Sequence, residues 1–467
     1  MDKTSETGRA SASRQGLDRS VNRYRVAVEL SETAKLALPM VLTQLGQVAM
    51  MTTDVVFIGR LGPEAVAAAA LASRIYLVTV AFATGLLAMV APLAAEGFGA
   101  GNLGVVRRSL RMGLWAALLI SLPIMAIPLC GEQILFAFGQ APHVTRLAQQ
   151  YLFGLTWGAA PALLFLAIRT FMGAVRRPEP ALGVTLAAIP VNALLVYLLI
   201  HGKLGLPRLE LFGAGLATTL VNCATFLAGL WFATICRPFR DYRVLAHLWR
   251  FDWPMMRQLI VIGMPVSISY LMDAGFFSAA AFLMGMISTA ALAAHQIASQ
   301  VFVILYMIPS GISMAAAVRV GNAVGRSDGP GAKRAGLIAM LLGIVAAAIL
   351  TVVVITTRFE ITALFLGKSE DDINGTIGLA GNLLLVGALF FITEATHSIA
   401  LGTLHGLKDT RVPLLFTTTG YWLIGFPLSY VLSVEMGPIG IWIGMAIGTT
   451  TSTALLVLRF KLLASRL

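Results

Sequence analysis

Residues 274–318 read AGFFSAAAFLMGMISTAALAAHQIASQVFVILYMIPSGISMAAAV and contain no Asp, Glu, Lys or Arg. A helix needs about 20 mostly apolar residues to cross the hydrocarbon core of a bilayer. The run therefore has room for most of two membrane-spanning helices, joined by a turn near Ser288. The whole chain shares this character, because 58% of its 467 residues are hydrophobic and 12% are charged, about half the charged fraction of soluble domains.

Charge-poor apolar stretches of this kind recur along the chain from Leu36 onward. They predict an all-α integral membrane protein with twelve transmembrane helices, because each stretch is long enough to cross the bilayer. The predicted spans cover residues 36–58, 68–93, 109–130, 147–171, 180–201, 212–236, 258–284, 291–318, 336–356, 376–402, 412–434 and 438–459. An even number of spans places both termini on the same side of the membrane.

Lys and Arg are distributed unequally between the two sides of these spans. Most of them fall in the termini and in the loops on the same side as the termini. The opposite side carries Arg60, Arg146, Lys203, Arg208, Arg358 and Lys368. Cytoplasmic loops carry an excess of Lys and Arg, so both termini are predicted to be cytoplasmic. The net charge of +12 then indicates contacts with the anionic lipids of the bilayer, and nucleic acid is not expected as a partner.

Two polar segments divide the chain. Residues 1–34 are basic and lack the apolar core of a signal peptide, which predicts a disordered cytoplasmic arm. Residues 237–257 are basic and aromatic and predict a cytoplasmic linker. The linker separates an N-terminal six-helix bundle, residues 35–236, from a C-terminal six-helix bundle, residues 258–467.

The two halves repeat each other. At a constant offset of 226, matching residues include Pro39 and Pro265, Gly59 and Gly285, Gly85 and Gly311, and Gly99 and Gly325. Later in each half, an offset of 233 pairs Gly173 with Gly406 and Pro180 with Pro413. An offset that spans an even number of helices makes the repeats parallel, and transporters with such repeats bind substrate between the two halves. The alternative is a duplication that was kept only for packing.

Three carboxylates lie inside predicted spans, Asp54, Asp273 and Glu394, and none has a nearby Lys or Arg in the flanking sequence except Arg60 near Asp54. A charge at mid-membrane costs about 2.5–3.5 kcal/mol, so an acid retained there indicates function. Burial favours the neutral acid, so each group can bind a proton, or stay charged while it holds a cation such as Na⁺. The alternatives are an ion pair of Asp54 with Arg60, and hydrogen bonds of Asp273 and Glu394 to a neighbouring Ser or Tyr.

Other polar residues interrupt the apolar spans and are candidates for the wall of a substrate cavity. They are Gln44, Gln47, Asn192, Gln296, Gln300 and His397. Gln44 and Gln47 are three residues apart and are expected on one helix face. The alternative for each is a hydrogen bond that holds two helices together.

Missing motifs narrow the class of protein. The chain has no GxxxxGK[ST] motif for ATP phosphates and no HExxH or GxSxG catalytic motif, which argues against an ATP-driven pump and against an enzyme. Its three cysteines include no CxxC pair, so no metal or disulfide framework is expected. No cofactor is predicted, and an ion gradient is left as the energy source.

Several longer motifs resemble one transporter family, the multidrug and toxic compound extrusion (MATE) family in its NorM-like bacterial branch. They are TTDVVFIGRLG (52–62), GMPVSISYLMDAGFF (263–277), AAHQIASQ (293–300), IPSGISMAAAVRVGNAVG (308–325), GLKDTRVP (406–413) and YWLIGFPLSY (421–430). The resemblance covers nearly all of residues 30–460. It implies two six-helix bundles around a central cavity, in the plasma (inner) membrane of a bacterium. The implied activity is export of organic cations and drugs in exchange for Na⁺ or H⁺, which would confer antibiotic resistance.

The family's site residues carry over one at a time. Asp54 matches the acid of helix 1, Asp273 the usual Glu of helix 7, and Glu394 the usual Asp of helix 10, while Asn192 matches an Asn of helix 5. The sequence departs from the family pattern at Ala188, which replaces the first helix 5 Asn, and at Leu404-His405-Gly406, which replaces LRG. The swapped acids leave the coupling ion open.

The sequence therefore predicts a secondary multidrug efflux transporter that works as a monomer on small cationic or hydrophobic substrates. Two alternatives stay open. A flippase for a lipid-linked saccharide needs a cationic cavity for pyrophosphate, for which Arg169 is the nearest candidate. A membrane-embedded enzyme needs a catalytic cluster, and the sequence shows none.

Overall fold

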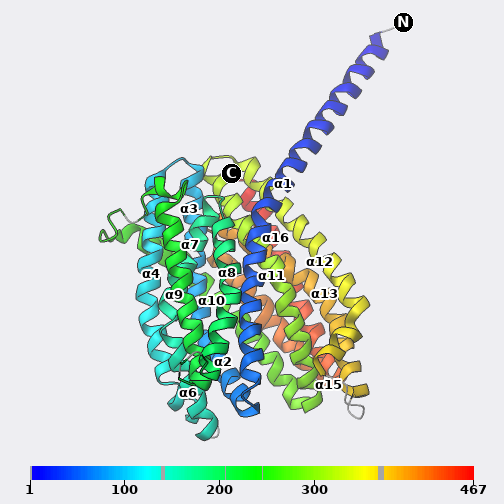
Figure 1. Ribbon diagram of the computed structural model, residues 1–467. Helices are drawn as coiled ribbons and strands as arrows, with labels where there is room; N and C mark the ends of the chain where they lie inside the picture. Colours follow the sequence, from blue (N-terminus) through cyan, green and yellow to red (C-terminus); the bar gives the residue numbers. More distant parts are fainter. Residues whose placement is uncertain are drawn as a thin grey trace.

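The computed structural model describes residues 3–137, 142–203, 205, 207–244, 246–366 and 373–466, with side chains described outside 3–25, 364–366 and 373–376. The described chain is helical throughout and has no strand (Figure 1). The first half contains α1 (Lys3–Gly59), α2 (Pro63–Ala88), α3 (Val90–Gly99), α4 (Leu103–Leu129), α5 (Gly131–Ala137), α6 (Pro142–Thr156), α7 (Ala159–Ala174), α8 (Glu179–His201) and α9 (Glu210–Ile235). A short helix η1 (Phe239–Tyr242) follows. The second half contains α10 (Trp253–Ile287), α11 (Thr289–Gly325), α12 (Gly329–Leu366), α13 (Ile373–Gly406), α14 (Arg411–Thr418), the π-helical η2 (Thr419–Gly425), α15 (Phe426–Met436) and α16 (Pro438–Ala464).

These helices make the twelve predicted crossings. Within the described residues, ten segments are long and apolar enough to span a membrane by themselves, and α2 with α3 counts as one of them, Pro63–Gly99. The eleventh is the pair α6 and α7, which bends by 46° at a short break. The twelfth consists of α14, η2 and α15, which follow one another without a gap from Arg411 to Met436. The prediction of twelve spans is confirmed.

The predicted turn at Ser288 separates α10 from α11. Ser288 has extended backbone angles, with φ −168° and ψ 161°, and its hydroxyl accepts a hydrogen bond from the backbone N–H of Ala291 at 3.0 Å. A serine oxygen in this position satisfies one of the free N–H groups at a helix start. The long apolar run 274–318 is therefore divided into two helices by a single capping residue.

Two contacts between the halves show the repeat directly. A Cβ added to Gly85 of α2 would lie 2.5 Å from Cα of Ser267 in α10, and one added to Gly311 of α11 would lie 2.6 Å from the backbone N of Val41 in α1. At the offset of 226 predicted from the sequence, Gly85 becomes Gly311 and Val41 becomes Ser267. The same backbone contact is thus made twice around a pseudo-two-fold axis.

A second pair of contacts follows the same rule nearer to the chain termini. Gly99 packs against the backbone of Asn322, and Gly325 packs against the backbone of Glu96. Only glycine permits helices to approach this closely, because any side chain would meet the other backbone. These contacts hold the two bundles together at the end of the molecule where both chain termini lie, which we call the terminal end (Figure 1).

The N-terminal segment differs from its prediction. A disordered arm was expected over residues 1–34, but α1 is helical from Lys3 and its first turns project away from the bundle (Figure 1). Extending a formed helix adds one hydrogen bond per residue, which makes such an extension cheap once the packed part has nucleated it. Further along α1, Glu29 forms an ion pair with Arg319 of α11, and Thr33 is buried.

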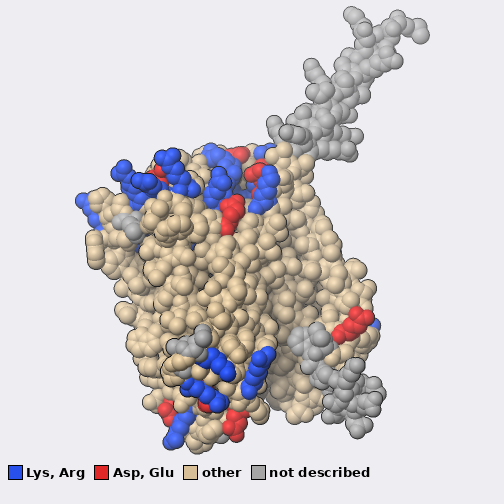
Figure 2. Space-filling model, viewed as in Figure 1, with Lys and Arg blue, Asp and Glu red and all other residues tan. Residues whose placement is uncertain are grey.

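The predicted linker lies against α4 of the first bundle. Arg107 donates to the carbonyl oxygen of Tyr242 at 2.8 Å, and the Trp115 indole donates to that of Leu248 at 2.9 Å. Phe239 and Tyr242 are buried in the core of that bundle. In Figure 2 the charged side chains gather at the terminal end and at the opposite end, with an uncharged band between them, as expected of a membrane-spanning body.

Candidate substrate cavity and cation sites

A cavity of about 650 Å³ lies between the two bundles. The first bundle lines it with residues of α1, α2, α3, α7 and the start of α8, and the second with residues of α10, α11 and α13. Its wall includes the aromatic residues Tyr270, Phe277, Phe302 and Tyr306. A pocket of this size with mostly apolar walls and a few polar groups suits a drug-sized ligand.

The cavity is open at one end and closed at the other. Leu77 and Val78, which line it on the part of α2 far from the terminal end, are 45% and 52% exposed. Met89 and Val318, which line it toward the terminal end, are fully buried. The tightly packed glycine contacts therefore form the floor of a cleft that opens away from the chain termini.

Two of the three predicted acids lie in the wall of this cavity. Asp273 of α10 lines it, and its Oδ1 is buried without a hydrogen-bond partner. Glu394 of α13 also lines it and is 4% exposed. Within the described residues, neither acid forms an ion pair with Lys or Arg. Both carboxylates are thus free to take a proton or a cation from the cavity.

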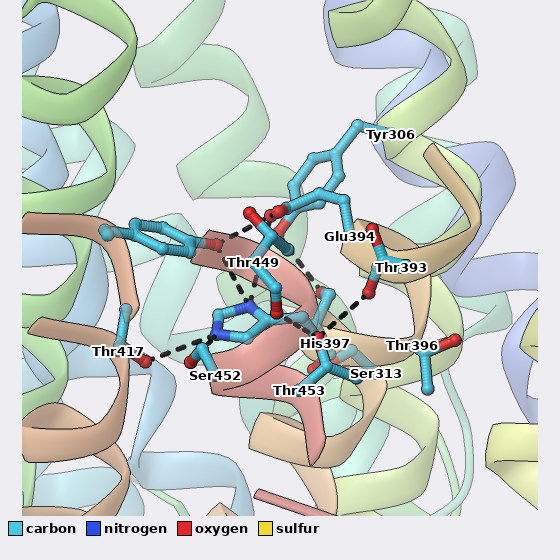
Figure 3. A network of polar contacts seen from close by, with 12 residues as sticks. Tyr306, Ser313, Thr393, Glu394, Thr396, His397, Thr417, Thr449, Ser452 and Thr453 are labelled. Carbon is cyan, nitrogen blue, oxygen red and sulfur yellow. Dashed lines mark hydrogen bonds and ion pairs between the residues drawn. The ribbon is translucent and has the colours of Figure 1, made fainter. Parts of the chain in front are cut away.

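Behind Glu394 a buried polar network runs into the second bundle. The hydroxyl of Tyr421 donates to Glu394 Oε2 at 3.0 Å and lies 3.3 Å from Nδ1 of His397. The other ring nitrogen of His397 lies 3.3 Å from the Thr417 hydroxyl and 3.2 Å from that of Ser452 (Figure 3). The predicted alternative for Glu394, a hydrogen bond to a Tyr, is therefore present, although Glu394 reaches the cavity as well.

The π-helical turn η2 brings Tyr421 into this network. Such turns change the direction of side chains within a helix and are frequent at functional sites. Gly420 of η2 packs against Ser452 and Gly448 of α16, and its missing side chain makes room for this approach. The sequence did not point to Tyr421, because the 3.6-residue period of an α-helix does not predict where a π-helical turn with an extra residue will occur.

Asp54 occupies a separate site inside the first bundle. It is 8% exposed and does not line the cavity. Asn192 of α8 donates its amide to Asp54 Oδ1 at 2.6 Å, and the Thr218 hydroxyl of α9 donates to Oδ2 at 3.3 Å. The alternative pairing with Arg60 is wrong, since the guanidinium of Arg60 lies over the ring of Phe57 at 5.3 Å and forms no ion pair with Asp54.

The cavity candidates divide into two groups. Gln44, Gln296 and Gln300 lie in the wall, and the amide of Gln44 donates to the Ser310 hydroxyl at 3.3 Å across the two bundles. Gln47, Asn192 and His397 do not line the cavity, so their prediction as cavity residues is wrong.

Each of the three misplaced residues has a physical reason. Beyond Gln44, α1 leaves the cavity wall and packs on α8, where Gly46 meets Thr185. The side-chain amide of Asn192 donates to Asp54 inside the first bundle, away from the cavity. On α13, Glu394 and Ser398 are one turn apart and face the cavity, whereas the ring of His397 lies toward α14 and α16.

Two arginines of the first bundle complete the charged lining, Arg74 of α2 and Arg169 of α7. From the sequence, Arg169 was considered only as a candidate for a flippase. The two described histidines in the wall are His295, whose Nδ1 accepts from the Trp442 indole at 3.2 Å, and His405. Among the described residues no group of three or more His, Cys, Asp or Glu could hold a metal ion.

Comparison with known sequences identifies relatives over nearly the whole chain. The MatE family model matches residues 39–198 and 265–431, one segment in each bundle. A protein of Bradyrhizobium diazoefficiens named "Probable multidrug resistance protein NorM" is 57% identical over 449 residues, which cover 96% of either chain. A protein of the same name from Rhodopseudomonas palustris is 52% identical and covers 92% of this chain and 91% of its own.

Solved structures share the fold at low sequence identity. The crystal structure of the eukaryotic MATE transporter AtDTX14 superposes with a TM-score of 0.84 at 19% identity, over 94% of this chain and 98% of that one. A multidrug resistance MATE transporter solved in an outward-facing conformation gives a TM-score of 0.85 at 18% identity, over 94% and 96%. Both bundles and their relative placement are thus a known arrangement.

Proposed function

The chain belongs to the MatE family, and we propose that it exports organic cations and other drugs across the bacterial inner membrane in exchange for Na⁺ or H⁺. Its relatives are named multidrug resistance proteins and not enzymes. The observation that carries the proposal is the pair of cavity acids, Asp273 and Glu394, neither of which forms an ion pair with Lys or Arg among the described residues; the one basic side chain near them is the imidazole of His397, 4.0 Å from Glu394.

The coupling follows from competition for these two carboxylates. A cationic drug and the driving cation both need the negative charge that Asp273 and Glu394 supply. Binding of one lowers the affinity for the other, and this coupling is reciprocal. A proton or Na⁺ that arrives from the open side therefore releases the drug there. The same site, opened to the other side, gives up its cation and takes the next drug.

The direction of the cleft fits export. The distribution of Lys and Arg supports cytoplasmic chain termini. The cavity opens away from the terminal end, and so in this topology it faces outward, ready to receive the driving cation and release drug. Because the two bundles of one chain enclose the cavity, we propose that a monomer is the working unit.

Asp54 is proposed as a second cation or proton site. It holds buried partners from α8 and α9 and does not reach the cavity, so it acts through the packing of the first bundle and not by contact with the drug.

The cavity charges argue against the flippase alternative. Arg74 and Arg169 supply two positive groups, but Asp273 and Glu394 share the same cavity and would repel a pyrophosphate. A site for a multiply charged anion needs an excess of basic groups.

The test uses purified protein in liposomes loaded with ethidium, under an imposed Na⁺ or pH gradient. Asp273→Asn and Glu394→Gln should each abolish gradient-driven export. Glu435→Gln, which removes an exposed acid at the end of α15, serves as the matched control and should transport like the unmodified protein. The gradient that drives export identifies the coupling ion. Full export in both cavity variants would remove these acids from the mechanism.

A further inference from the structure

Arg169 is a half-buried cation that the proposed exchange cycle does not use. It lies on α7 in the cavity wall, and its Nε and Nη1 atoms are buried without a hydrogen-bond partner. No ion pair or hydrogen bond to its guanidinium is formed by any residue that the structure describes. Buried N–H groups of a cation that lack an acceptor are costly, so a guanidinium kept in this state indicates a ligand that pairs with it.

The internal repeat gives the depth of Arg169 relative to the acids. At the offset of 233, Arg169 corresponds to Gly402 of α13, which lies eight residues beyond Glu394 toward the terminal end. Eight helical residues span about 12 Å. Arg169 therefore lies near the floor of the cleft, about 12 Å, or slightly more than two helical turns, below the level of Glu394.

The surroundings of Arg169 keep it from being neutralised by the protein. The cavity residues near the floor are apolar or neutral, such as Met40, Thr170 and Pro178. Asp273 and Glu394 lie on the other bundle and higher in the cleft. The cavity thus has a positive group at its floor on one wall and a negative pair on the opposite wall, separated by the length of a small aromatic compound.

We propose that Arg169 is a carboxylate-binding subsite, which selects drugs that carry a carboxylate at one end of a flat body and a positive charge at the other. The carboxylate pairs with the guanidinium in a two-pronged hydrogen bond, the geometry for which arginine is suited. The cationic end then points toward Asp273 and Glu394. Tyr270, which precedes Asp273 on the floor side of α10, and Tyr306, whose hydroxyl donates to Ser398 at 3.1 Å, offer aromatic contacts for the body of the drug. This subsite rests on the proposed export of drugs through the same cavity.

The test uses two dyes that differ at a single group. Rhodamine 110 carries a free carboxylate, and rhodamine 123 is its methyl ester with the same cationic ring system. Binding of each dye to purified protein is measured by fluorescence anisotropy. The unmodified protein should prefer rhodamine 110, and Arg169→Gln should weaken its binding about tenfold or more while rhodamine 123 binding stays within about twofold. Arg169→Lys, which keeps the charge but loses the fork, should restore part of the preference.

Arg146→Gln is the matched control, because Arg146 is an exposed arginine of α6 that does not line the cavity. It should leave the preference for rhodamine 110 unchanged. Equal losses for both dyes in Arg169→Gln, no loss for either, or a loss of preference in Arg146→Gln would each overturn the subsite. Retained rhodamine 123 binding shows that the variant is folded.

Failure of the subsite can be told apart from failure of the export proposal. Glu394→Gln tests the latter with rhodamine 123, which has no carboxylate. If gradient-driven export of rhodamine 123 depends on Glu394 while Arg169→Gln changes nothing, the exchanger stands and the subsite does not.

Discussion

Gly85→Ala tests whether the backbone contact between α2 and α10 holds the cleft closed at the terminal end. The new Cβ would lie 2.5 Å from Cα and 2.7 Å from N of Ser267, whereas ordinary contacts begin at about 3.4 Å. The two helices must therefore separate by nearly 1 Å, and both neighbouring atoms belong to the backbone, which cannot rotate away. Overpacking of this kind costs about 1–3 kcal/mol.

This cost falls on the conformation that contains the contact. If the bundles separate at the terminal end during transport, the inward-open conformation lacks this contact and is not destabilised. The equilibrium between the outward-open and inward-open conformations then shifts toward the inward-open one by a factor of about 5–150. The repeat supplies an independent second variant, Gly311→Ala, whose Cβ would lie 2.6 Å from the backbone N of Val41. It should shift the same equilibrium in the same direction.

The assay follows access to the open cleft. Cys130, Cys223 and Cys236 are replaced by Ser, and Ser278 in the cavity wall is changed to Cys. The rate at which a membrane-impermeant maleimide labels this cysteine from outside whole cells reports the outward-open population. Gly85→Ala and Gly311→Ala should slow the labelling. Gly183→Ala in α8, where an added Cβ meets nothing within 4 Å, is the matched control. Equal labelling in all three variants would refute the reasoning.

Two further sites give shorter predictions. Lys408→Met removes the 2.5 Å ion pair with Glu96 across the terminal end. Both side chains are about one third exposed, so the loss of the pair costs at most about 1 kcal/mol. The labelling rate should therefore change less than it does in Gly85→Ala. The charge-reversed pair Glu96→Lys with Lys408→Glu should restore the labelling rate, and no recovery would exclude the pair as a latch. Asn192→Ala leaves Asp54 with the longer Thr218 bond alone and should lower the midpoint of thermal unfolding, with a loss of about 1–3 kcal/mol. Asp54→Asn should leave rhodamine 123 binding within about twofold, because Asp54 does not touch the cavity, while transport is lost; a large fall in affinity would place Asp54 in the drug site.

The sequence predicted the features that depend on period and on repetition. The twelve spans followed from apolar length, and the offset of 226 anticipated a pair of glycine contacts that no single helix pattern would reveal. Asp273 and Glu394 were found because an unpaired acid in an apolar helix is costly wherever it faces lipid. Such arguments need only the cost of burial and the spacing along the chain.

The predictions that were wrong depended on which way a helix face turns. Gln47 is the repeat partner of Asp273 at the offset of 226, yet Asp273 lines the cavity and Gln47 does not. The two helices share a sequence pattern but differ in the neighbours on which they pack. His397 was misplaced for a similar reason, because the π-helical turn that carries Tyr421 creates a polar pocket behind α13 that draws the ring inward. Tilt and neighbour choice are properties of the whole bundle.

The charges of the cavity show how the two halves diverged within a common backbone. At the respective offsets, Arg74 and Arg169 correspond to Gln300 and Gly402, while Asp273 and Glu394 correspond to Gln47 and Pro161. The cavity cations therefore lie on the first bundle and the cavity acids on the second. A cavity with the same charges on both walls would hold the driving cation equally well in either bundle. Here the driving cation binds to the second bundle alone and changes the charge of that wall only. This change alters the electrostatic attraction between the two walls, so the cation stabilises the two conformations to different extents. A coupled exchanger requires such a difference.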